Sequence, residues 1–179
     1  MNVRTTLATL MVTAALCPPG IPAQSGTATS SGETIGQACA DEAYRQFDYW
    51  LGQWTVTGPQ GNQVGTNHII RVSDGCAVLE QWRDARGVRG TSISFYDTAR
   101  KQWEQHWMGG QGGALHLTGG LHEGNIRLEG KRMGPNGPVM DRVTWIRMED
   151  GKVRQFWETS SDEGKTWTTS FDGVYTPVK

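Results

Sequence analysis

The sequence predicts an all-β protein, a roughly ten-stranded antiparallel up-and-down barrel with a short N-terminal helix. Three observations support this fold class. From residue 53 onward, short runs rich in Val, Ile, Thr, Phe and Trp alternate with turn residues at intervals of eight to twelve positions. The links between these runs are too short for parallel crossovers, so neighbouring strands are antiparallel. The chain also contains eight Trp, which favours a β-rich core or an aromatic-lined cavity.

Residues 1–23 have the pattern of a secretory signal peptide. Arg4 precedes an uncharged run from Thr5 to Leu16, and Ala23 is a small residue suited to the position before a cut. A lipoprotein acylated at Cys17 is the alternative, which the preceding Leu16 disfavours. The apolar run is shorter than the ~20 residues that a membrane-spanning helix requires. We therefore expect an exported, soluble protein, periplasmic or secreted after cleavage.

Residues 24–38 consist mainly of Ser, Thr and Gly, so they bury too little apolar surface to fold and predict a flexible spacer. Residues 39–179 are then a single domain, within the usual size of ~100–200 residues. The formal net charge of the whole chain is −1, and its basic residues are scattered. This distribution argues against a nucleic-acid partner. The sequence does not indicate an oligomeric state.

Two cysteines remain after the expected cleavage, Cys39 and Cys76. In an oxidising compartment such a pair is expected to form a disulfide. The bridge would tie the leading segment to an early strand, and closing this loop is worth ~3–4 kcal/mol on the chain-entropy account. Two buried thiols are the alternative.

The leading segment, residues 41–51, has apolar side chains at steps of three and four, which predicts one short helix or helical turn. Gly52 ends it and the first strand follows. We expect Phe47 and Trp50 to close one end of the barrel and Trp54 to point inward.

The turn residues delimit ten strands. We predict them at residues 53–58, 64–72, 77–84, 89–96, 101–108, 114–121, 125–132, 139–148, 152–160 and 167–176. Closure into a barrel removes the exposed edges of such a meander, whereas a two-sheet sandwich is the alternative. Strands flank the stretch Gly109–Gly113, which predicts a hairpin or a lid over the barrel mouth rather than a phosphate loop.

Several strands alternate so that Trp and an amide or acid share one face, and this face is the candidate lumen. A register error of one residue would exchange the two faces. We predict that a ligand would contact seven residues, namely Glu80, Trp82, Gln105, Trp107, Trp145, Gln155 and Trp157.

From about Cys39 to the C-terminus, the chain contains an ordered set of short motifs. The motifs are Phe47-Asp48-Tyr49-Trp50-Leu51-Gly52-x-Trp54, Gly75-Cys76, Glu80-Gln81-Trp82, Phe95-Tyr96-Asp97, Trp103-x-Gln105-x-Trp107, Val153-Arg154-Gln155, Ser161-Asp162-x-Gly164-Lys165-Thr166-Trp167 and Phe171-Asp172-Gly173-x-Tyr175. This set resembles a known family, the bacterial calycin-like barrels called domain of unknown function 1579. The resemblance implies a lipocalin-like barrel, often exported, with no established activity and no catalytic residues.

Nitrobindin-like haem proteins, also calycin barrels, bind iron through a His on a late strand. The four His of this chain are His68, His106, His116 and His122, and none follows residue 122. We therefore expect no haem and no other cofactor. The His spacing also matches no common metal-ligand pattern, so no metal site is predicted.

Three functions remain open. The first is a binding protein that holds a small apolar or aromatic molecule, with Glu80, Gln105 and Gln155 orienting it. The second is an enzyme in which Glu80 or Glu158 performs acid–base chemistry on a hydrophobic substrate. The third is a structural envelope protein whose barrel is filled by its Trp side chains. No catalytic motif favours the enzyme, because no Gly-x-Ser-x-Gly elbow is present.

Overall fold

The structure is a computed structural model that describes residues 39–179. The predicted signal peptide and spacer, residues 1–38, lie outside the described residues. Ten strands form, each within two residues of its predicted bounds. They are β1 (Gly52–Thr57), β2 (Gln63–Val72), β3 (Ala77–Asp84), β4 (Arg89–Asp97), β5 (Gln102–Gly109), β6 (Ala114–His122), β7 (Asn125–Gly134), β8 (Gly137–Arg147), β9 (Val153–Ser160) and β10 (Thr168–Pro177).

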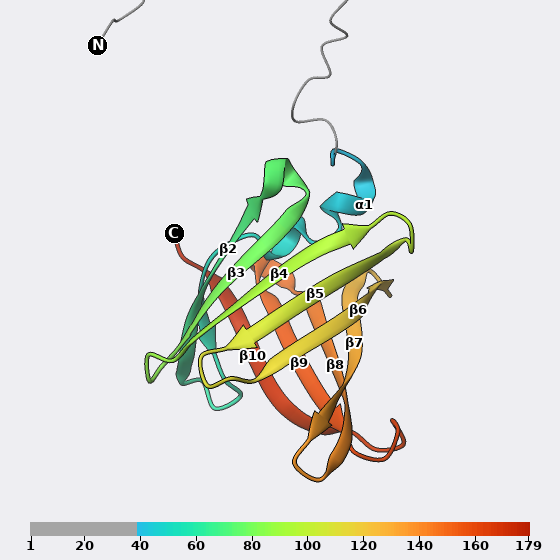
Figure 1. The fold of residues 1–179 in the computed structure, drawn as a ribbon. Helices are drawn as coiled ribbons and strands as arrows, with labels where there is room; N and C mark the ends of the chain where they lie inside the picture. The colour runs from blue at the N-terminus through green and yellow to red at the C-terminus, as the bar shows by residue number, and fades with distance from the viewer. Residues whose placement is uncertain (1–38) are drawn as a thin grey trace, which may run out of the picture. The chain divides into compact units, whose positions relative to one another are not determined.

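The strands form one closed antiparallel barrel in which every strand pairs with its neighbours in sequence (Figure 1). The first and last strands close it, with Trp54 opposite Pro177 and Thr57 opposite Val174. The predicted barrel is confirmed and the two-sheet sandwich is wrong. Closure pairs both edges that a ten-stranded meander would otherwise expose to another chain.

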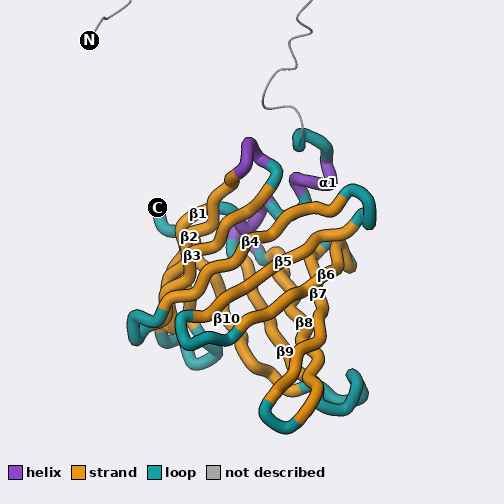
Figure 2. The backbone as a smooth tube through the Cα atoms, viewed as in Figure 1, coloured by secondary structure: helices purple, strands orange, loops and turns teal. Residues whose placement is uncertain are grey.

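Because the strands run up and down, the loops between consecutive strands lie alternately at the two ends of the barrel (Figure 2). The end that carries α1 also holds two short 3₁₀ turns, η2 (Ser73–Gly75) and η3 (Glu149–Gly151). The opposite end, which we call the mouth, carries the β1–β2, β3–β4, β5–β6, β7–β8 and β9–β10 hairpins. The stretch Gly109–Gly113 is one of these hairpins, because Gly109 N–H donates to the Gly113 carbonyl over 2.8 Å.

The short helix or helical turn predicted over residues 41–51 is present and consists of two pieces, α1 (Glu42–Arg45) and the 3₁₀ turn η1 (Asp48–Trp50). Arg71, at the end of β2, accounts for the break. Its guanidinium donates to the Tyr44 carbonyl over 2.7 Å and forms an ion pair with Asp48. The carbonyl that would continue the helix is therefore bound to the barrel wall.

Four aromatic side chains, Phe47, Trp50, Trp103 and Trp145, fill the barrel at the α1 end, and we call them the aromatic plug. All four are completely buried. Phe47 stacks on Trp50 with ring centroids 5.0 Å apart and meets Trp145 edge-on, also at 5.0 Å. Truncating one such side chain to Ala typically costs about 3–5 kcal/mol. The predicted closure by Phe47 and Trp50 is confirmed.

Trp54 also points inward, as predicted, and its indole N–H donates to the Trp50 carbonyl over 3.0 Å. Tyr49 fixes the plug to the far wall, because its hydroxyl donates to the Trp145 carbonyl over 2.6 Å and accepts from the Ile126 N–H over 3.1 Å. Burial raises the pKa of Tyr49 to about 12, so the hydroxyl stays a donor at physiological pH.

The predicted disulfide is present between Cys39 and Cys76, which are 37 positions apart in sequence and whose Cα atoms are 5.0 Å apart. It joins the start of the described chain to the residue that precedes β3. Together with Arg71, it holds the helical segment against one end of the barrel. Among residues 39–179, no helix is both long enough and apolar enough to cross a membrane.

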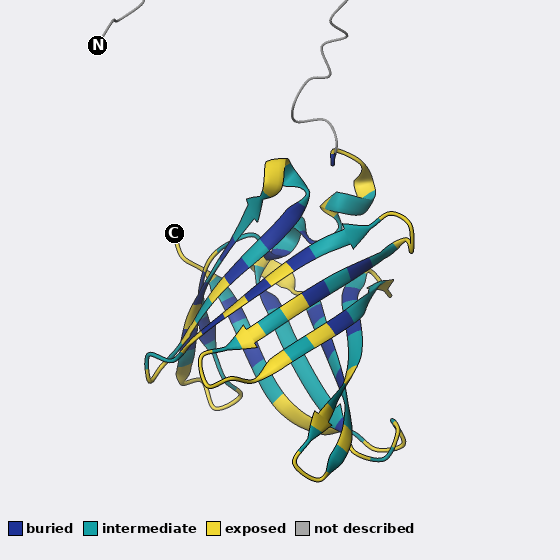
Figure 3. Cartoon of the chain, in the orientation of Figure 1, coloured by how far each residue is buried: buried dark blue, intermediate teal, exposed yellow. Residues whose placement is uncertain are grey.

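Buried and exposed residues alternate along the strands, as the barrel requires (Figure 3). In β5, Trp103 and Gln105 are buried whereas His106 is exposed. The face predicted as the lumen is therefore the inner one. Its residues divide by depth into the aromatic plug and a second group nearer the mouth.

Candidate functional site

A cavity of about 270 Å³ lies inside the barrel on the mouth side of the plug. Its walls come from seven of the ten strands, so no single hairpin forms it. Five of its lining side chains are aromatic, four others are carboxylates or amides, and three are aliphatic. The lining residues are Val64, Glu80, Trp82, Asp84, Gln105, Trp107, Leu115, Val143, Gln155, Trp157, Phe171 and Tyr175.

Six of the seven residues predicted to contact a ligand line this cavity: Glu80, Trp82, Gln105, Trp107, Gln155 and Trp157. The seventh, Trp145, is inward-facing but belongs to the aromatic plug and lies outside the lining. Sequence reasoning missed the contribution of β10, from which Phe171 and Tyr175 reach the cavity. Their spacing of four residues on one strand, with Gly173 between them, was the signal for a shared inner face.

Glycines leave room for the aromatic rings of the lining. A Cβ added at Gly65 would stand 2.4 Å from the end of the Trp82 ring, and one at Gly109 would stand 2.5 Å from the Trp107 ring. Gly173 has the same relation to Phe171, at 2.6 Å. Each ring therefore occupies space next to bare backbone that a side chain at the glycine would fill.

The aromatic rings of the lining meet in two pairs. Trp82 and Phe171 are edge-to-face, with centroids 5.9 Å apart and an interplanar angle of 85°. Trp107 and Trp157 are tilted by 58° with centroids 6.4 Å apart. Such contacts hold each ring in one orientation, so the apolar walls of the cavity are formed before any molecule enters.

A buried polar network forms the base of the cavity. The two carboxylate oxygens of Glu80 each accept one hydrogen bond of 2.6 Å, from the Asn67 amide and from the Ser92 hydroxyl. The Tyr175 hydroxyl donates to the Gln155 side-chain oxygen over 2.5 Å and lies 3.4 Å from the Asn67 amide nitrogen. Side chains from β2, β3 and β4 are thus linked to side chains from β9 and β10.

Burial raises the pKa of Glu80 above its ordinary value, and the hydrogen bonds from Ser92 and Asn67 offset only part of this effect. Burial also raises the pKa of Tyr175, and the nearby negative charge of Glu80 adds to the shift. Both groups are therefore biased toward their protonated, neutral forms.

The remaining polar groups of the lining are also held. The Gln105 amide donates to the Ser94 hydroxyl over 3.1 Å. The Trp157 indole N–H donates over 2.9 Å to Asp141, which is itself buried and ion-paired to Arg132 at 2.8 Å. Asp141 therefore orients the Trp157 ring without lining the cavity. The sequence offered one signal for it, an acidic residue on the inward face of β8.

Glu158, the other carboxylate considered for acid–base chemistry, does not line the cavity. It points to the opposite face of β9 from Gln155 and Trp157 and forms an ion pair with Arg142 at 3.0 Å. Alternation along the strand is the physical reason, since Val153 is buried and Gln155 and Trp157 line the cavity. Of the two carboxylates considered for acid–base chemistry, only Glu80 lines the cavity.

No protein-family model matches the chain, and no curated protein sequence matches it either. The closed ten-stranded antiparallel barrel is consistent with a calycin-like fold.

Proposed function

We propose that this protein is an exported binding protein whose barrel holds a small, largely apolar or aromatic molecule in the cavity at its mouth end. The observation that carries the proposal is the convergence of Trp82, Trp107, Trp157 and Phe171 on one cavity that also contains a few fixed polar groups. Apolar walls with a small number of placed polar groups are the usual composition of small-molecule sites. The cavity, at about 270 Å³, favours a ligand smaller than a typical drug.

In this proposal the aromatic rings supply stacking and apolar burial, while the polar base sets orientation. Glu80, Gln105 and Gln155 are the groups we propose to orient the molecule, and the Tyr175 hydroxyl adds a fourth. Because these polar groups already bond to one another, an apolar ligand leaves none of them unpaired, and a polar atom on the ligand serves mainly to orient it. A molecule with one ring and one or two polar atoms combines apolar burial with such orientation.

Export remains part of the proposal. A disulfide persists in oxidising compartments, so the Cys39–Cys76 bridge supports a destination outside the cytosol. Cleavage after Ala23, with acylation at Cys17 as the alternative, and membership of the calycin-like family of unknown function are proposed on the sequence motifs. The mass of the N-terminus of the exported protein decides between cleavage and acylation.

A second function, acid–base catalysis on the bound molecule, rests on one observation. Glu80 is a fully buried carboxyl group with a raised pKa on a cavity wall, which is the environment of many catalytic carboxyls. Such an enzyme would lose turnover in Glu80→Gln while still binding its substrate. A variant that loses neither turnover nor binding would remove Glu80 from both functions.

The test of binding uses the Trp side chains as reporters. Three Trp line the cavity, so a panel of fatty acids, small aromatics and haem should include members that quench or shift the fluorescence of the protein with saturable titration curves. Trp157→Phe should reduce the amplitude of the fluorescence change. Trp167 lies in the β9–β10 loop and does not line the cavity, so Trp167→Phe should leave this amplitude unaltered. No response to any compound would favour a barrel that is a filled structural element.

A further inference from the structure

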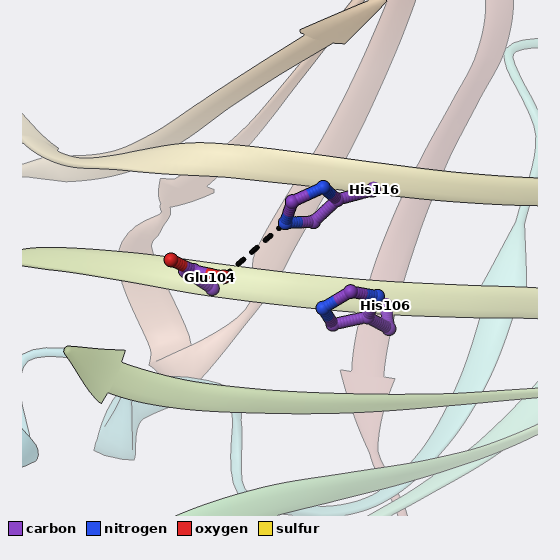
Figure 4. Close-up of side chains that lie close together, drawn as sticks. All are labelled: Glu104, His106 and His116. Carbon is purple, nitrogen blue, oxygen red and sulfur yellow. Dashed lines mark hydrogen bonds and ion pairs between the residues drawn. The ribbon is translucent and has the colours of Figure 1, made fainter. Parts of the chain in front are cut away.

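The outer face of the β5–β6 hairpin carries two imidazoles side by side. His106 on β5 and His116 on β6 are direct cross-strand partners. Their rings are stacked, with centroids 4.3 Å apart and planes 10° from parallel. Both residues are exposed, and His106 also stacks on Phe95 of β4, with centroids 6.4 Å apart and planes 7° from parallel. Figure 4 shows the two rings facing each other across the hairpin.

A carboxylate completes the group. Glu104 precedes His106 by two residues and therefore shares its outward face, and its Oε2 lies 3.2 Å from His116 Nε2 (Figure 4). One donor atom from each of the three side chains lies within 4.8 Å of the others. The three belong to two adjacent, hydrogen-bonded strands, so the backbone holds their Cβ atoms in fixed relative positions.

We propose that Glu104, His106 and His116 bind one late first-row divalent metal ion, Zn²⁺ or Cu²⁺, on the outer wall of the barrel. Imidazole nitrogen is a preferred ligand of both ions, and two His with one carboxylate form a common three-ligand set for Zn²⁺, with water in the remaining position. Metal–ligand bonds of about 2.0–2.2 Å bring ligand atoms closer together than 4.8 Å, which small rotations of the two exposed imidazoles toward Glu104 achieve.

One neighbouring cation competes for the carboxylate. Arg100 Nη1 lies 3.7 Å from Glu104 Oε1, but it is held more closely by Asp97, at 2.6 Å. The contact uses Oε1, whereas Oε2 is the oxygen that faces His116. Arg100 therefore leaves one carboxylate oxygen for the metal ion.

The metal site is separate from the cavity. Strand β5 presents Gln105 and Trp107 to the barrel interior, and it presents the metal-binding residues Glu104 and His106 to the exterior. Metal binding and ligand binding are thus testable independently on the same protein. The structural alternatives are the ion pair between Glu104 and His116 and the stacking of His106 on its neighbouring rings. Neither alternative involves a metal ion, so the metal affinity of His106→Gln distinguishes the proposed site from them.

Calorimetric titration of the untagged protein with Zn²⁺ and with Cu²⁺ tests the proposal. We expect one ion per chain, with affinity reduced at least about tenfold in His106→Gln, in His116→Gln and in Glu104→Gln. The matched control is His122→Gln, which removes an exposed His near the end of the same strand and should bind as the wild type does. Equal affinity of His106→Gln and the wild type would overturn the proposal, as would no binding at millimolar metal.

Two further measurements report on the same site. Zn²⁺ at a hundredfold excess over its dissociation constant should raise Tm by roughly 5–10 °C, and a chelator should reverse the rise. The three His are exposed, so the His variants should keep the wild-type Tm without metal, whereas the Glu104 side chain is only 12 % exposed and the Tm of Glu104→Gln is its folding check. The Cu²⁺ complex should show nitrogen ligation by electron paramagnetic resonance, and a spectrum without it would contradict the two-His site.

Discussion

At the scale of single residues, the molecule depends on polar side chains that are buried but bonded. Glu80 is the clearest case, because both of its oxygens accept short hydrogen bonds inside an otherwise aromatic interior. A buried carboxyl without these partners would cost several kcal/mol. The same hydrogen bonds fix the orientation of the Glu80 carboxyl on the cavity wall. They therefore serve both the stability of the barrel and the proposed contact with a ligand.

Glu80→Gln should alter how stability depends on pH. The folded-state pKa of Glu80 is raised above its ordinary value of 4.5 by burial, so the folded protein binds this proton more tightly than the unfolded chain. The wild type therefore loses stability as pH rises from about 4.5 through the raised pKa. Gln does not titrate, and the Ser92 hydroxyl can rotate to accept from its amide. Urea denaturation at several pH values should show the variant gaining stability relative to the wild type as pH rises.

A stability difference between Glu80→Gln and the wild type that stays flat, or falls, as pH increases would contradict this account of Glu80. The surface variant Glu158→Gln is the matched control. Its ion pair with Arg142 is partly exposed, and pairs of this kind contribute at most about 1 kcal/mol.

The faces of the strands could be predicted from residue alternation, but depth along the barrel axis could not. Alternation placed Glu80, Gln105 and Trp145 on inner faces, and all three are buried. Whether an inward residue lines the cavity or joins the plug depends on strand tilt and stagger, which a single strand does not encode. Trp145 was assigned to the site for this reason, and Tyr175 was overlooked.

At the scale of elements, β5 illustrates how one strand serves two surfaces. Its inward residues meet the cavity and its outward residues carry the proposed metal ligands. The pairing of His106 with His116 was already implicit in the predicted bounds of the two strands, since a hairpin that pairs Met108 with Ala114 also pairs these two His. Their spacing in sequence matches no common metal motif because the contact is made across strands.

Gly65→Ala should destabilise the barrel by about 1–3 kcal/mol, the usual cost of overpacking. The added Cβ would stand 2.4 Å from the Trp82 ring and 2.5 Å from the backbone oxygen of Arg83, and the backbone cannot move aside as a flexible side chain could. Gly120→Ala on β6 is the control, because a Cβ there meets nothing within 4 Å. Chemical denaturation should show a loss for the first variant only. Equal stabilities would show that Trp82 is not fixed by bare backbone at Gly65.

The helical segment is the element that the sequence described least well. Apolar spacing predicted one short helix or helical turn, but not its division by the contacts of Arg71 with Tyr44 and Asp48. Those contacts join positions far apart in sequence, so no local pattern contains them. The disulfide was predictable because only the compartment and the cysteine count were needed.

Replacing both Cys39 and Cys76 by Ser should lower the free energy of unfolding by about 3–4 kcal/mol, since the loop that they close has a sequence separation of 37. The loss should appear equally when the wild type is unfolded under reducing conditions. The reduced wild type is thus the internal control, and a double variant as stable as the oxidised protein would show that the bridge does not hold the helical segment to the barrel.

At the scale of the whole domain, the barrel is asymmetric along its axis. One end is filled by the aromatic plug and secured by a disulfide and by Arg71. The other end contains a cavity whose rings lie against glycines and whose base is a hydrogen-bonded network. The closed end supplies the rigidity, and the mouth end offers the space in which a molecule could bind.

The most direct test of the central claim is native mass spectrometry of the protein purified from its own host compartment. The wild type should carry one small molecule, lost on activation in the gas phase. Leu115→Trp fills the cavity from β6 and should lack it, whereas Ala114→Trp, on the neighbouring outward-facing position, should retain it. Circular dichroism of both variants is the check that they are folded. A folded Leu115→Trp protein that carries the same molecule as the wild type would contradict binding in this cavity.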